Sequence, residues 1–534
     1  MAKERGGSGG GGGEKKLLVK VVWKSYAAEL KLLLTALLVL CSLATLLQFL
    51  PSRSSSFLSI STSDFRFCIS RAISQQNDAV SSSSSSSSIP LITNSSALSS
   101  SSSSPTPSPQ PQPQLLQDRE TTEEEVVQPN GVVKRAFNPY GSAAYSFITM
   151  GAYRGGPNTF AIVGLASKPL HVYGRPAYDC LWAPLNSSHE PISAVGYKML
   201  PDWGYGRVYT VVVVNCTFSD PINADNSGGK LVLRASTSGG GDRKFNLTHN
   251  IDALVEKPGS VNFTVFTSPP KYKYLYCGSS LYGNLSPQRV REWLAYHIRL
   301  FGPESHFVIH DAGGVHEEVM EVLRPWMELG YVTLQDVREQ ERFDGYYHNQ
   351  FMVVNDCLHR YKFMAKWMFF FDVDEFIYMP PKNTIKSVLN SLSDYSQFTI
   401  EQMPMSSKLC FSQNAGKTYR KWGFEKLVYR DVKRGIRRDR KYAVQPRNVY
   451  ATGVHMSQNV AGKTTHKTEG RIKYFHYHGT IAQRREPCRN LGNWTEITFE
   501  NNPYVLDTTV SDIAGFVKKF ELKMIGSRLQ KTRQ

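Results

Sequence analysis

Cysteine is scarce in this chain, with eight among 534 residues. This is too few for a framework of small disulfide-dense domains, and no C-x-x-C pair is present to favour a structural zinc site. Acidic residues are also outnumbered, because 45 Asp and Glu stand against 62 Lys and Arg, a net charge of +17. In contrast, 41% of the residues are hydrophobic and 12% aromatic, which excludes a wholly disordered chain. The length predicts two or three domains.

Only one stretch, residues 32–50, is long and apolar enough to span a membrane, and Gln48 alone interrupts it. As a helix it would reach about 28 Å, close to the hydrocarbon thickness of a bilayer. Residues 1–31 carry seven Lys and Arg against three acids, so the positive-inside rule leaves them in the cytosol. A cleaved signal peptide is the alternative, but no small-residue cleavage site follows closely. We expect a single-pass, type II signal anchor.

Residues 51–135 are rich in serine and proline, with serine runs at 81–88 and 99–104. Such a segment buries too little apolar surface to offset its ordering entropy, so it is predicted to be a disordered stem. Seven of the eight cysteines lie beyond the anchor, an odd number that leaves at least one without an intramolecular partner. Glycosylation sequons also occur only there, at Asn94, Asn186, Asn215, Asn246, Asn262, Asn284 and Asn493. This organisation is typical of Golgi membrane enzymes and of some surface receptors.

Residues 136–268 are expected to form an antiparallel β-sandwich or barrel. Branched and aromatic residues gather there in short runs, separated by Gly, Pro, Asn and Asp. The runs lie at 159–167, 209–218, 231–237 and 261–267. Trp182, Trp203 and Tyr205 are candidates for a sugar-stacking platform, although a single aromatic residue more often belongs to the core.

Strands and helices alternate in residues 269–515, which are expected to form an α/β domain. The predicted strands lie at 272–278, 306–311, 331–334 and 367–371. The predicted helices begin after Ser286-Pro287, run from Val315 to Trp326, and cover 351–361. This β-α order predicts a parallel sheet with ligands bound outside the carboxyl ends of its strands.

The segment Asp372-Val373-Asp374-Glu375 follows the last of these strands, which is apolar at every position. Three carboxylates within four residues are costly to desolvate unless a cation neutralises them. In an extended chain, Asp372 and Asp374 would lie on one side and Val373 would face the core. Two such oxygen ligands suit Mn²⁺ or Mg²⁺, which would in turn bind a diphosphate. A solvated acidic turn is the alternative.

Four segments in fixed order resemble glycosyltransferase family 92, and within it the plant galactan synthases. They are residues 276–302, 348–361, 366–378 and 473–480. The resemblance covers about residues 140–500. It implies a catalytic domain of the GT-A type preceded by an all-β carbohydrate-binding-like domain. It also implies an inverting, Mn²⁺-dependent transfer of galactose from UDP-galactose onto β-1,4-galactan side chains of pectin, in the Golgi lumen.

The resemblance also implies a metal ligand beyond Asp372 and Asp374. Enzymes of this fold commonly add a histidine near the end of the catalytic domain, which corresponds here to His476 or, as a second choice, to His478. The family more usually has arginine at the position of His478, which puts a phosphate contact from that position in doubt.

Sheet topology alone indicates residues near the uridine and ribose of the donor, at the ends of the first two strands. These residues are Cys277, Gly278, Ser279 and Asp311. An inverting displacement also needs a base that accepts a proton from the acceptor hydroxyl. The candidates, in order of preference, are Glu425, Glu401 and Asp431. For each of them an exposed, salt-bridged carboxylate is the alternative.

Twelve Lys and Arg but only three acids lie between residues 417 and 447. A lumenal position argues against nucleic acid, so we expect this run to contact the UDP phosphates and the galacturonate-rich pectin backbone. Arg437 and Arg438 are the members whose charge reversal tests this. Residues 516–534 are expected to form a basic tail, and a homo-oligomer is compatible with the sequence.

Two other functions fit the same pattern. A non-catalytic glycan receptor would share the anchor and the β domain, but it need not retain Asp372, Asp374 and the late histidines. A transferase of the same fold that uses UDP-arabinopyranose or a glycoprotein glycan is the other alternative. The two donor sugars differ by one hydroxymethyl group, and a pocket discriminates such a difference by only about 1–3 kcal/mol.

Overall fold

The computed structural model describes residues 126–129, 132–134, 147–167, 176–186, 189–201, 209–236, 248–343, 346–414, 421–435 and 438–532. The predicted cytosolic tail, the anchor at 32–50 and most of the predicted stem lie outside these ranges, as do Trp203 and Tyr205. Within the described ranges, no helix is both long enough and apolar enough to cross a membrane.

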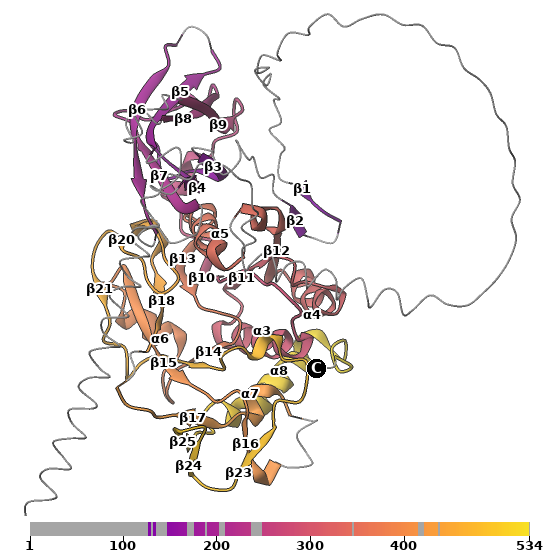
Figure 1. The fold of residues 1–534 in the computed structure, drawn as a ribbon. Coiled ribbons are helices and arrows are strands. Elements are labelled where there is room, and N and C mark those ends of the chain that lie inside the picture. Colours follow the sequence, from indigo (N-terminus) through magenta and orange to yellow (C-terminus); the bar gives the residue numbers. More distant parts are fainter. Residues whose placement is uncertain are drawn as a thin grey trace, which may run out of the picture. The chain divides into compact units, whose positions relative to one another are not determined.

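The first folded part is an antiparallel sheet of seven strands in the order β3-β4-β7-β6-β5-β8-β9 (Figure 1). The strands are β3 Phe147–Arg154, β4 Thr159–Ser167, β5 Ala177–Pro184, β6 Ile192–Met199, β7 Tyr209–Thr217, β8 Gly229–Ser236 and β9 Thr248–Glu256. Three of the four predicted strands are therefore confirmed. Trp182 is 2% exposed and stacks on Phe160 inside this sheet, so it belongs to the core. A disulfide between Cys180 and Cys216 joins β5 to β7.

The predicted strand at 261–267 is wrong, because residues Phe263–Phe266 form a 3₁₀ helix, η1. The Asn262 side chain accepts a hydrogen bond from the backbone N–H of Thr264 and caps this turn. Phe266 packs edge-on against Phe363, with ring centroids 4.9 Å apart. A local cap and a tertiary aromatic contact thus override the β propensity of the run.

The second part is built on a larger mixed sheet in the order β1-β2-β12-β11-β10-β13-β18-β15-β22-β14, with β21 paired to β15. Its strands are β1 Val126–Val127, β2 Val132–Lys134, β10 Tyr272–Cys277, β11 Ser305–Asp311, β12 Val332–Asp336, β13 Ala365–Phe370, β14 Glu375–Tyr378, β15 Gln397–Pro404, β18 Arg440–Val444, β21 Thr464–Thr465 and β22 Lys473–His476. Strands β2, β12, β11, β10 and β13 are parallel, as the β-α order predicts. The end of the predicted stem is not disordered, because β2 pairs with β12.

Six α-helices are described in the ranges given above: α3 Pro287–Phe301, α4 Glu317–Glu328, α5 Tyr346–Arg360, α6 Ile385–Ser391, α7 Gly423–Lys426 and α8 Ala514–Ile525. Helix α3 begins as its sequence predicts, because the Ser286 side chain accepts the backbone N–H of Arg289 and Pro287 takes the first position. It ends at Gly302, whose φ of 77° favours glycine.

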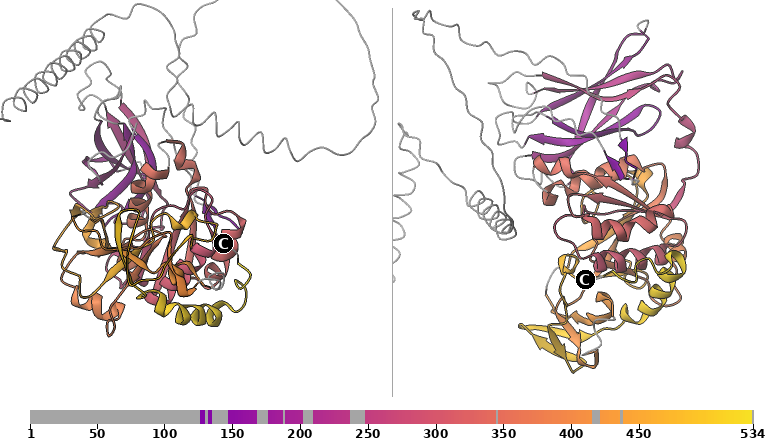
Figure 2. Two further views of the ribbon diagram at one scale, coloured as in Figure 1. Left: turned by 60° about the horizontal axis from the view of Figure 1, so that its bottom comes forward. Right: turned by 90° about the vertical axis from the view of Figure 1, so that its right-hand side faces the viewer.

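Helix α5 lies between the two sheets, which the views of Figure 2 show from two sides. Its residues Phe351, Met352 and Val353 pack into a core shared with β3, β4 and β7. On the opposite face, Val354 and Leu358 pack against the larger sheet. A disulfide between Cys277 and Cys357 also ties α5 to the end of β10. The β domain is therefore attached to the part built on the larger sheet through a shared apolar core.

Smaller elements complete the C-terminal half. They are β16 Leu409–Phe411 with β23 Asn490–Gly492, β17 Tyr429–Asp431 with β24 Glu496–Phe499 and β25 Asn502–Leu506, β19 Val449–Ala451 with β20 Asn459–Val460, and the 3₁₀ turns η2 Arg338–Phe343, η3 Ser412–Asn414, η5 Pro446–Asn448, η6 Thr480–Ala482 and η7 Ser511–Ile513. The third disulfide joins Cys410 to Cys488, so six of the seven cysteines beyond the predicted anchor are paired. The seventh, Cys68, lies outside the described residues.

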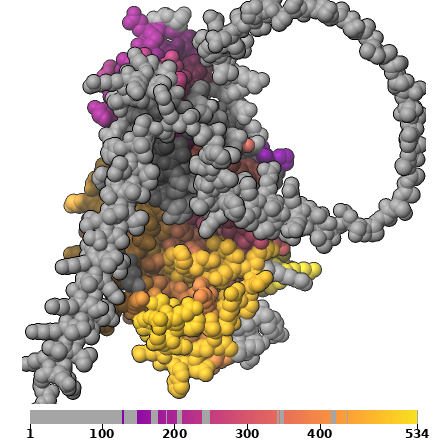
Figure 3. Space-filling view, viewed as in Figure 1, coloured from indigo at the N-terminus to yellow at the C-terminus, as the bar shows by residue number. Residues whose placement is uncertain are grey.

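The predicted basic tail at 516–534 is wrong, because α8 occupies most of it. The guanidinium of Arg291, on α3, donates to Glu521 on α8 at 2.8 Å, and both side chains are buried. Phe520 also stacks on Trp326, and Ile525 belongs to the main core. In the space-filling view the C-terminal residues form a continuous part of the surface (Figure 3).

Replacing Glu521 with Ala should destabilise the protein strongly, because it leaves the buried Arg291 guanidinium without its partner. Breaking a buried ion pair in this way costs about 3–5 kcal/mol. The measurement is the urea midpoint of the full-length protein. Glu304→Ala is the matched control, because its ion pair with Lys273 is half exposed and should matter little. Equal midpoints for the two variants would contradict the role of α8.

Candidate functional site

The Asp372–Glu375 segment forms a tight turn, so the predicted extended alternation is wrong here. The backbone N–H of Glu375 donates to the Asp372 carbonyl at 3.2 Å, and a Glu375 carboxylate oxygen accepts the N–H of Asp372 at 2.7 Å. The Trp293 indole N–H donates to the backbone carbonyls of Asp372 and Glu375, at 3.2 and 3.0 Å. Because the turn is held from within and from α3, Asp372 and Asp374 face different partners.

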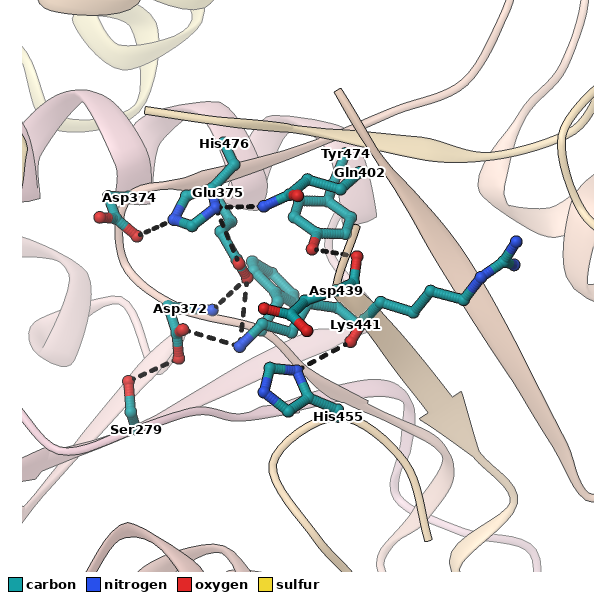
Figure 4. A network of polar contacts seen from close by, with 12 residues as sticks. Ser279, Asp372, Asp374, Glu375, Gln402, Asp439, Lys441, His455, Tyr474 and His476 are labelled. Carbon is teal, nitrogen blue, oxygen red and sulfur yellow. Dashed lines mark hydrogen bonds and ion pairs between the residues drawn. The ribbon is translucent and has the colours of Figure 1, made fainter. Parts of the chain in front are cut away.

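Lys441, on β18, neutralises the first side of the turn (Figure 4). Its ammonium donates to Asp372 at 2.7 Å and lies 3.7 Å from Glu375, while Ser279 donates to the other Asp372 oxygen at 2.8 Å. Lys441 is only 2% exposed and Glu375 only 1%. A buried cation between two carboxylates is the arrangement that desolvated charges require.

The pKa values in this cluster follow from burial and from the shared charge. Burial alone would raise the pKa of Asp372, but the charge and hydrogen bond of Lys441 and the hydrogen bond of Ser279 hold it below its usual value. Burial raises the pKa of Glu375 to about 7, against the opposing charge of Lys441. Burial would lower the pKa of Lys441, but Asp372 and Glu375 raise it above its usual value. Lys441 therefore stays charged.

The second side of the turn faces His476. Strand β22 pairs with β14 so that His476 lies opposite Glu375, and the His476 Nε2 atom is 3.5 Å from an Asp374 oxygen. The other Asp374 oxygen accepts the backbone N–H of Gly479 at 2.8 Å. The amide of Gln402 lies 2.5 Å from His476 Nδ1. Burial would lower the pKa of His476, but the hydrogen bond to Asp374 and the charge of Glu375 raise it.

These groups line a cavity of about 590 Å³ at the carboxyl ends of the parallel strands. Five of the predicted site residues meet there: Ser279, Asp372, Asp374, His476 and His478. The His478 ring is exposed and its centroid is 5.2 Å from that of His476. Sequence reasoning missed Lys441, Gln402 and the position of Glu375. Lys441 is hidden in the basic run, and only the pairing of β18 with β13 brings it to the cluster.

Three of the predicted donor-site residues have structural roles. Cys277 is bonded to Cys357 and fully buried. Gly278 is required by packing, because an added Cβ would lie 1.6 Å from the Tyr276 hydroxyl oxygen. Asp311 accepts the N–H groups of Gly313 and Val315, at 2.8 and 3.0 Å, and so fixes the turn before α4. Neither Cys277 nor Asp311 lines the 590 Å³ cavity.

The structure does not bring Glu425 to this cavity. Its carboxylate accepts the backbone N–H of Trp422 at 3.1 Å, capping α7, and pairs with Lys518. Asp431 is also occupied, because it accepts the N–H of Lys433 at 2.7 Å and pairs with Arg438. The second-choice base, Glu401, lines a neighbouring cavity of about 760 Å³.

The basic run does not form one surface. Three of its members interact elsewhere: Lys426 with Glu486, Arg430 with Asp507, and Arg447 with the carbonyls of Phe266 and Ser268. Lys441 reaches the carboxylate cluster, and Arg438 lines the 760 Å³ cavity. Arg437 lies outside the described residues. The predicted gathering of the whole run at the donor site is therefore wrong, although three of its residues, Arg438, Arg440 and Lys441, line the two cavities.

A divalent cation fits the second side of the turn. Two ligands with bonds of about 2.0–2.2 Å to one ion stand roughly 3–3.5 Å apart, which matches the 3.5 Å between Asp374 and His476. An oxygen and an imidazole suit Mn²⁺, and Mg²⁺ or Mn²⁺ commonly takes its other ligands from phosphates and water. The described residues contain no ready-made group of three such ligands. Asp372, which the sequence predicted as a ligand, is instead bound by Lys441 and Ser279.

Comparison with known proteins first defines the class. The sequence model of glycosyltransferase family 92 matches residues 272–513 of this chain, from β10 to η7. The chain is 62% identical to galactan beta-1,4-galactosyltransferase GALS3 of Arabidopsis thaliana, over 97% of each chain. It is 60% identical to galactan beta-1,4-galactosyltransferase GALS2 of Arabidopsis thaliana, over 100% of each chain. It is 53% identical to galactan beta-1,4-galactosyltransferase GALS1 of the same plant, over 75% of this chain and 80% of the relative. The chain belongs to glycosyltransferase family 92.

Glu375 should make stability depend on pH. Its pKa of about 7 in the folded protein lies above the unfolded value of about 4.3, so its contribution is full below about pH 4.3 and is lost as pH rises through 7. At about 1.4 kcal/mol per pKa unit, this loss is on the order of 4 kcal/mol. Glu375→Gln, which keeps an acceptor for the Asp372 N–H, should remove that slope.

The measurement is urea denaturation of the full-length protein between pH 4.5 and 7.5, in EDTA so that no cation binds. The exposed Asp394→Asn variant serves as the control and should keep the wild-type slope. Parallel curves for wild type and Glu375→Gln would show that this carboxyl is not protonated in the folded state at neutral pH.

Proposed function

We propose that this protein is an inverting β-1,4-galactosyltransferase that moves galactose from UDP-galactose onto β-1,4-galactan side chains of pectin. The names of relatives at 62% and 60% identity, matched over almost their whole length, support the reaction and the acceptor. The observation that carries the proposal is the cavity at the carboxyl ends of the parallel strands. It combines a facing Asp374–His476 pair with a buried lysine–carboxylate cluster.

Asp374 and His476 would hold Mn²⁺, or Mg²⁺, beside the diphosphate of the donor. When bound, such a cation neutralises the diphosphate charge and favours departure of UDP. With its amide turned so that the oxygen accepts the Nδ1–H of His476, Gln402 would leave Nε2 for the ion. His478, exposed in the same cavity, can donate a hydrogen bond to a phosphate oxygen.

Lys441 and Ser279 hold Asp372 in place beside that pair. The positive charge of Lys441 balances the negative charge of the carboxylates in the turn before the substrate binds. A preorganised charge of this kind costs no reorganisation during the reaction. The two hydrogen bonds from Trp293 hold the turn, so the groups that face the donor keep their positions. This arrangement supports binding of a nucleotide sugar through its phosphates, as in the GT-A fold.

The cellular setting of the proposal rests on sequence. Residues 32–50 would anchor the chain in the Golgi membrane as a single-pass type II protein, with residues 1–31 in the cytosol and the folded part in the lumen. The three disulfides agree with an oxidising compartment. The serine-rich stem would hold the catalytic part away from the membrane.

Asp374→Asn and His476→Gln should each lower the turnover of galactosyl transfer by at least about 10²-fold, because each removes one ligand of the cation. The assay uses full-length protein, UDP-galactose, a β-1,4-galacto-oligosaccharide and Mn²⁺. Asp394→Asn, in an exposed turn that does not line the cavity, is the matched control. EDTA should abolish the wild-type activity and added Mn²⁺ should restore it.

A donor screen completes the test. UDP-arabinopyranose should react more slowly than UDP-galactose but measurably, since only a hydroxymethyl group separates them. Transfer that is unchanged in EDTA, or in both variants, would contradict the metal assignment. Failure to use UDP-galactose with any galactan acceptor would contradict the reaction itself.

A further inference from the structure

A second cavity, of about 760 Å³, adjoins the one that contains the carboxylate turn. Four residues line both cavities: Gln402, Asp439, Val454 and His455. The second cavity is also bounded by Pro201, from the β domain, and by Phe351 of α5. Its volume is within the usual range of about 300–1,000 Å³ for ligand sites. Two adjoining cavities with a shared wall are what a transferase needs for a donor and an acceptor.

The second cavity is suited to a neutral ligand, not to a polyanion. Its two arginines are already committed: Arg438 pairs with Asp431, and Arg440 donates to Thr399 and to the His466 carbonyl, at 3.2 and 2.9 Å. Two carboxylates, of Glu401 and Asp439, also line it. Among the described residues, neither carboxylate has a hydrogen bond or an ion pair. Free carboxylates bind hydroxyl groups well and would repel galacturonate.

Asp439 occupies a fixed position at the junction of the two cavities. Its carbonyl accepts the Tyr474 hydroxyl at 3.1 Å, and the carbonyl of the next residue, Arg440, accepts His455 Nδ1 at 3.2 Å (Figure 4). The chain then enters β18, which places Lys441 at the 590 Å³ cavity, the proposed donor site. The backbone of Asp439 is thus held while its side chain stays exposed.

The other carboxylates that line the cavities are unsuited to the role of base. Asp372 accepts from Lys441 and Ser279, and Asp374 from Gly479 while it faces His476. Glu375 is buried inside the turn. Glu401 lines only the second cavity, so it cannot face the donor. Among the described residues, Asp439 is the carboxylate that is both unengaged and shared by the two cavities.

We infer that the second cavity binds the end of the neutral galactan acceptor and that Asp439 is the base of the transfer. This inference rests on the proposed galactosyl transfer. The acceptor hydroxyl oxygen forms a bond to the anomeric carbon of galactose, and the bond from that carbon to the diphosphate oxygen breaks. The hydroxyl proton passes to the Asp439 carboxylate, and UDP leaves with the electron pair of the broken bond.

His455 is the competing base, because its Nδ1–H donates to a carbonyl and leaves Nε2 as an acceptor in the shared wall. Asp439 is preferred because its carboxylate has no hydrogen bond or ion pair with any described residue, whereas the His455 ring is already held by the Arg440 carbonyl. The variants described next separate the two.

Azide can replace the acceptor sugar as the nucleophile, and it attacks the anomeric carbon without giving up a proton. A variant that lacks only the base should therefore still react with azide, whereas a variant with a damaged donor site should not. The full-length protein is assayed with UDP-galactose and either a β-1,4-galacto-oligosaccharide or sodium azide. Asp439→Asn should lower transfer to the sugar by about 10²–10⁴-fold and leave formation of galactosyl azide within a few-fold of wild type. His455→Gln should not show this split, and Asp394→Asn should match wild type in both reactions.

Retained sugar transfer in Asp439→Asn, or loss of both reactions, would overturn the assignment of Asp439. The assignment would also be overturned if His455→Gln lost transfer to the sugar but kept formation of galactosyl azide. A wild-type protein that is inactive with UDP-galactose in both reactions would overturn the proposed function, and this inference with it.

The acceptor cavity has its own test in Glu401→Gln. This change should raise KM for the oligosaccharide several-fold and leave KM for UDP-galactose unchanged, because Glu401 lines only the second cavity. An increase in the donor KM alone, or no change in either constant, would contradict the assignment of this cavity to the acceptor.

Discussion

The buried ammonium of Lys441 is the contact on which the site depends. It lies between Asp372 and Glu375, and without it the turn after β13 would hold desolvated carboxylates close together with no positive partner. Because β18 pairs directly with β13, the position of the Lys441 ammonium is set by the sheet and not by a loop. The second side of the turn is thereby left to Asp374 and His476.

Local sequence signals were enough to predict the parallel part of the sheet. The Ser286 cap, the proline after it and Gly302 define α3, and four apolar runs define β10 to β13. The carboxylate pair could also be found, because a motif at the end of a buried strand marks it, whereas His476 was reached through the resemblance of residues 473–480 to a known family. In each case the information lies within a few neighbouring residues.

The rest could not be predicted because it depends on contacts between distant residues. Nothing near Lys441 distinguishes it from the other basic residues of its run; the pairing of β18 does. Glu425 is the first-choice base and Asp311 a predicted donor-site residue, but local backbone N–H groups occupy both carboxylates. The C-terminal helix has the composition of a basic tail, and its contact between Glu521 and Arg291 spans 230 residues.

Helix α5 is where the β domain meets the catalytic half, and this has a consequence for evolution of the chain. One face of α5 is covered by the β domain, the other by the sheet that ends at the donor cavity, and a disulfide joins it to the strand before Ser279. Excising the β domain would leave an apolar surface in water directly behind the substrate sites. The two halves therefore cannot be shuffled as independent modules, and insertions and swaps should be tolerated only at the outer rim of the seven-stranded sheet.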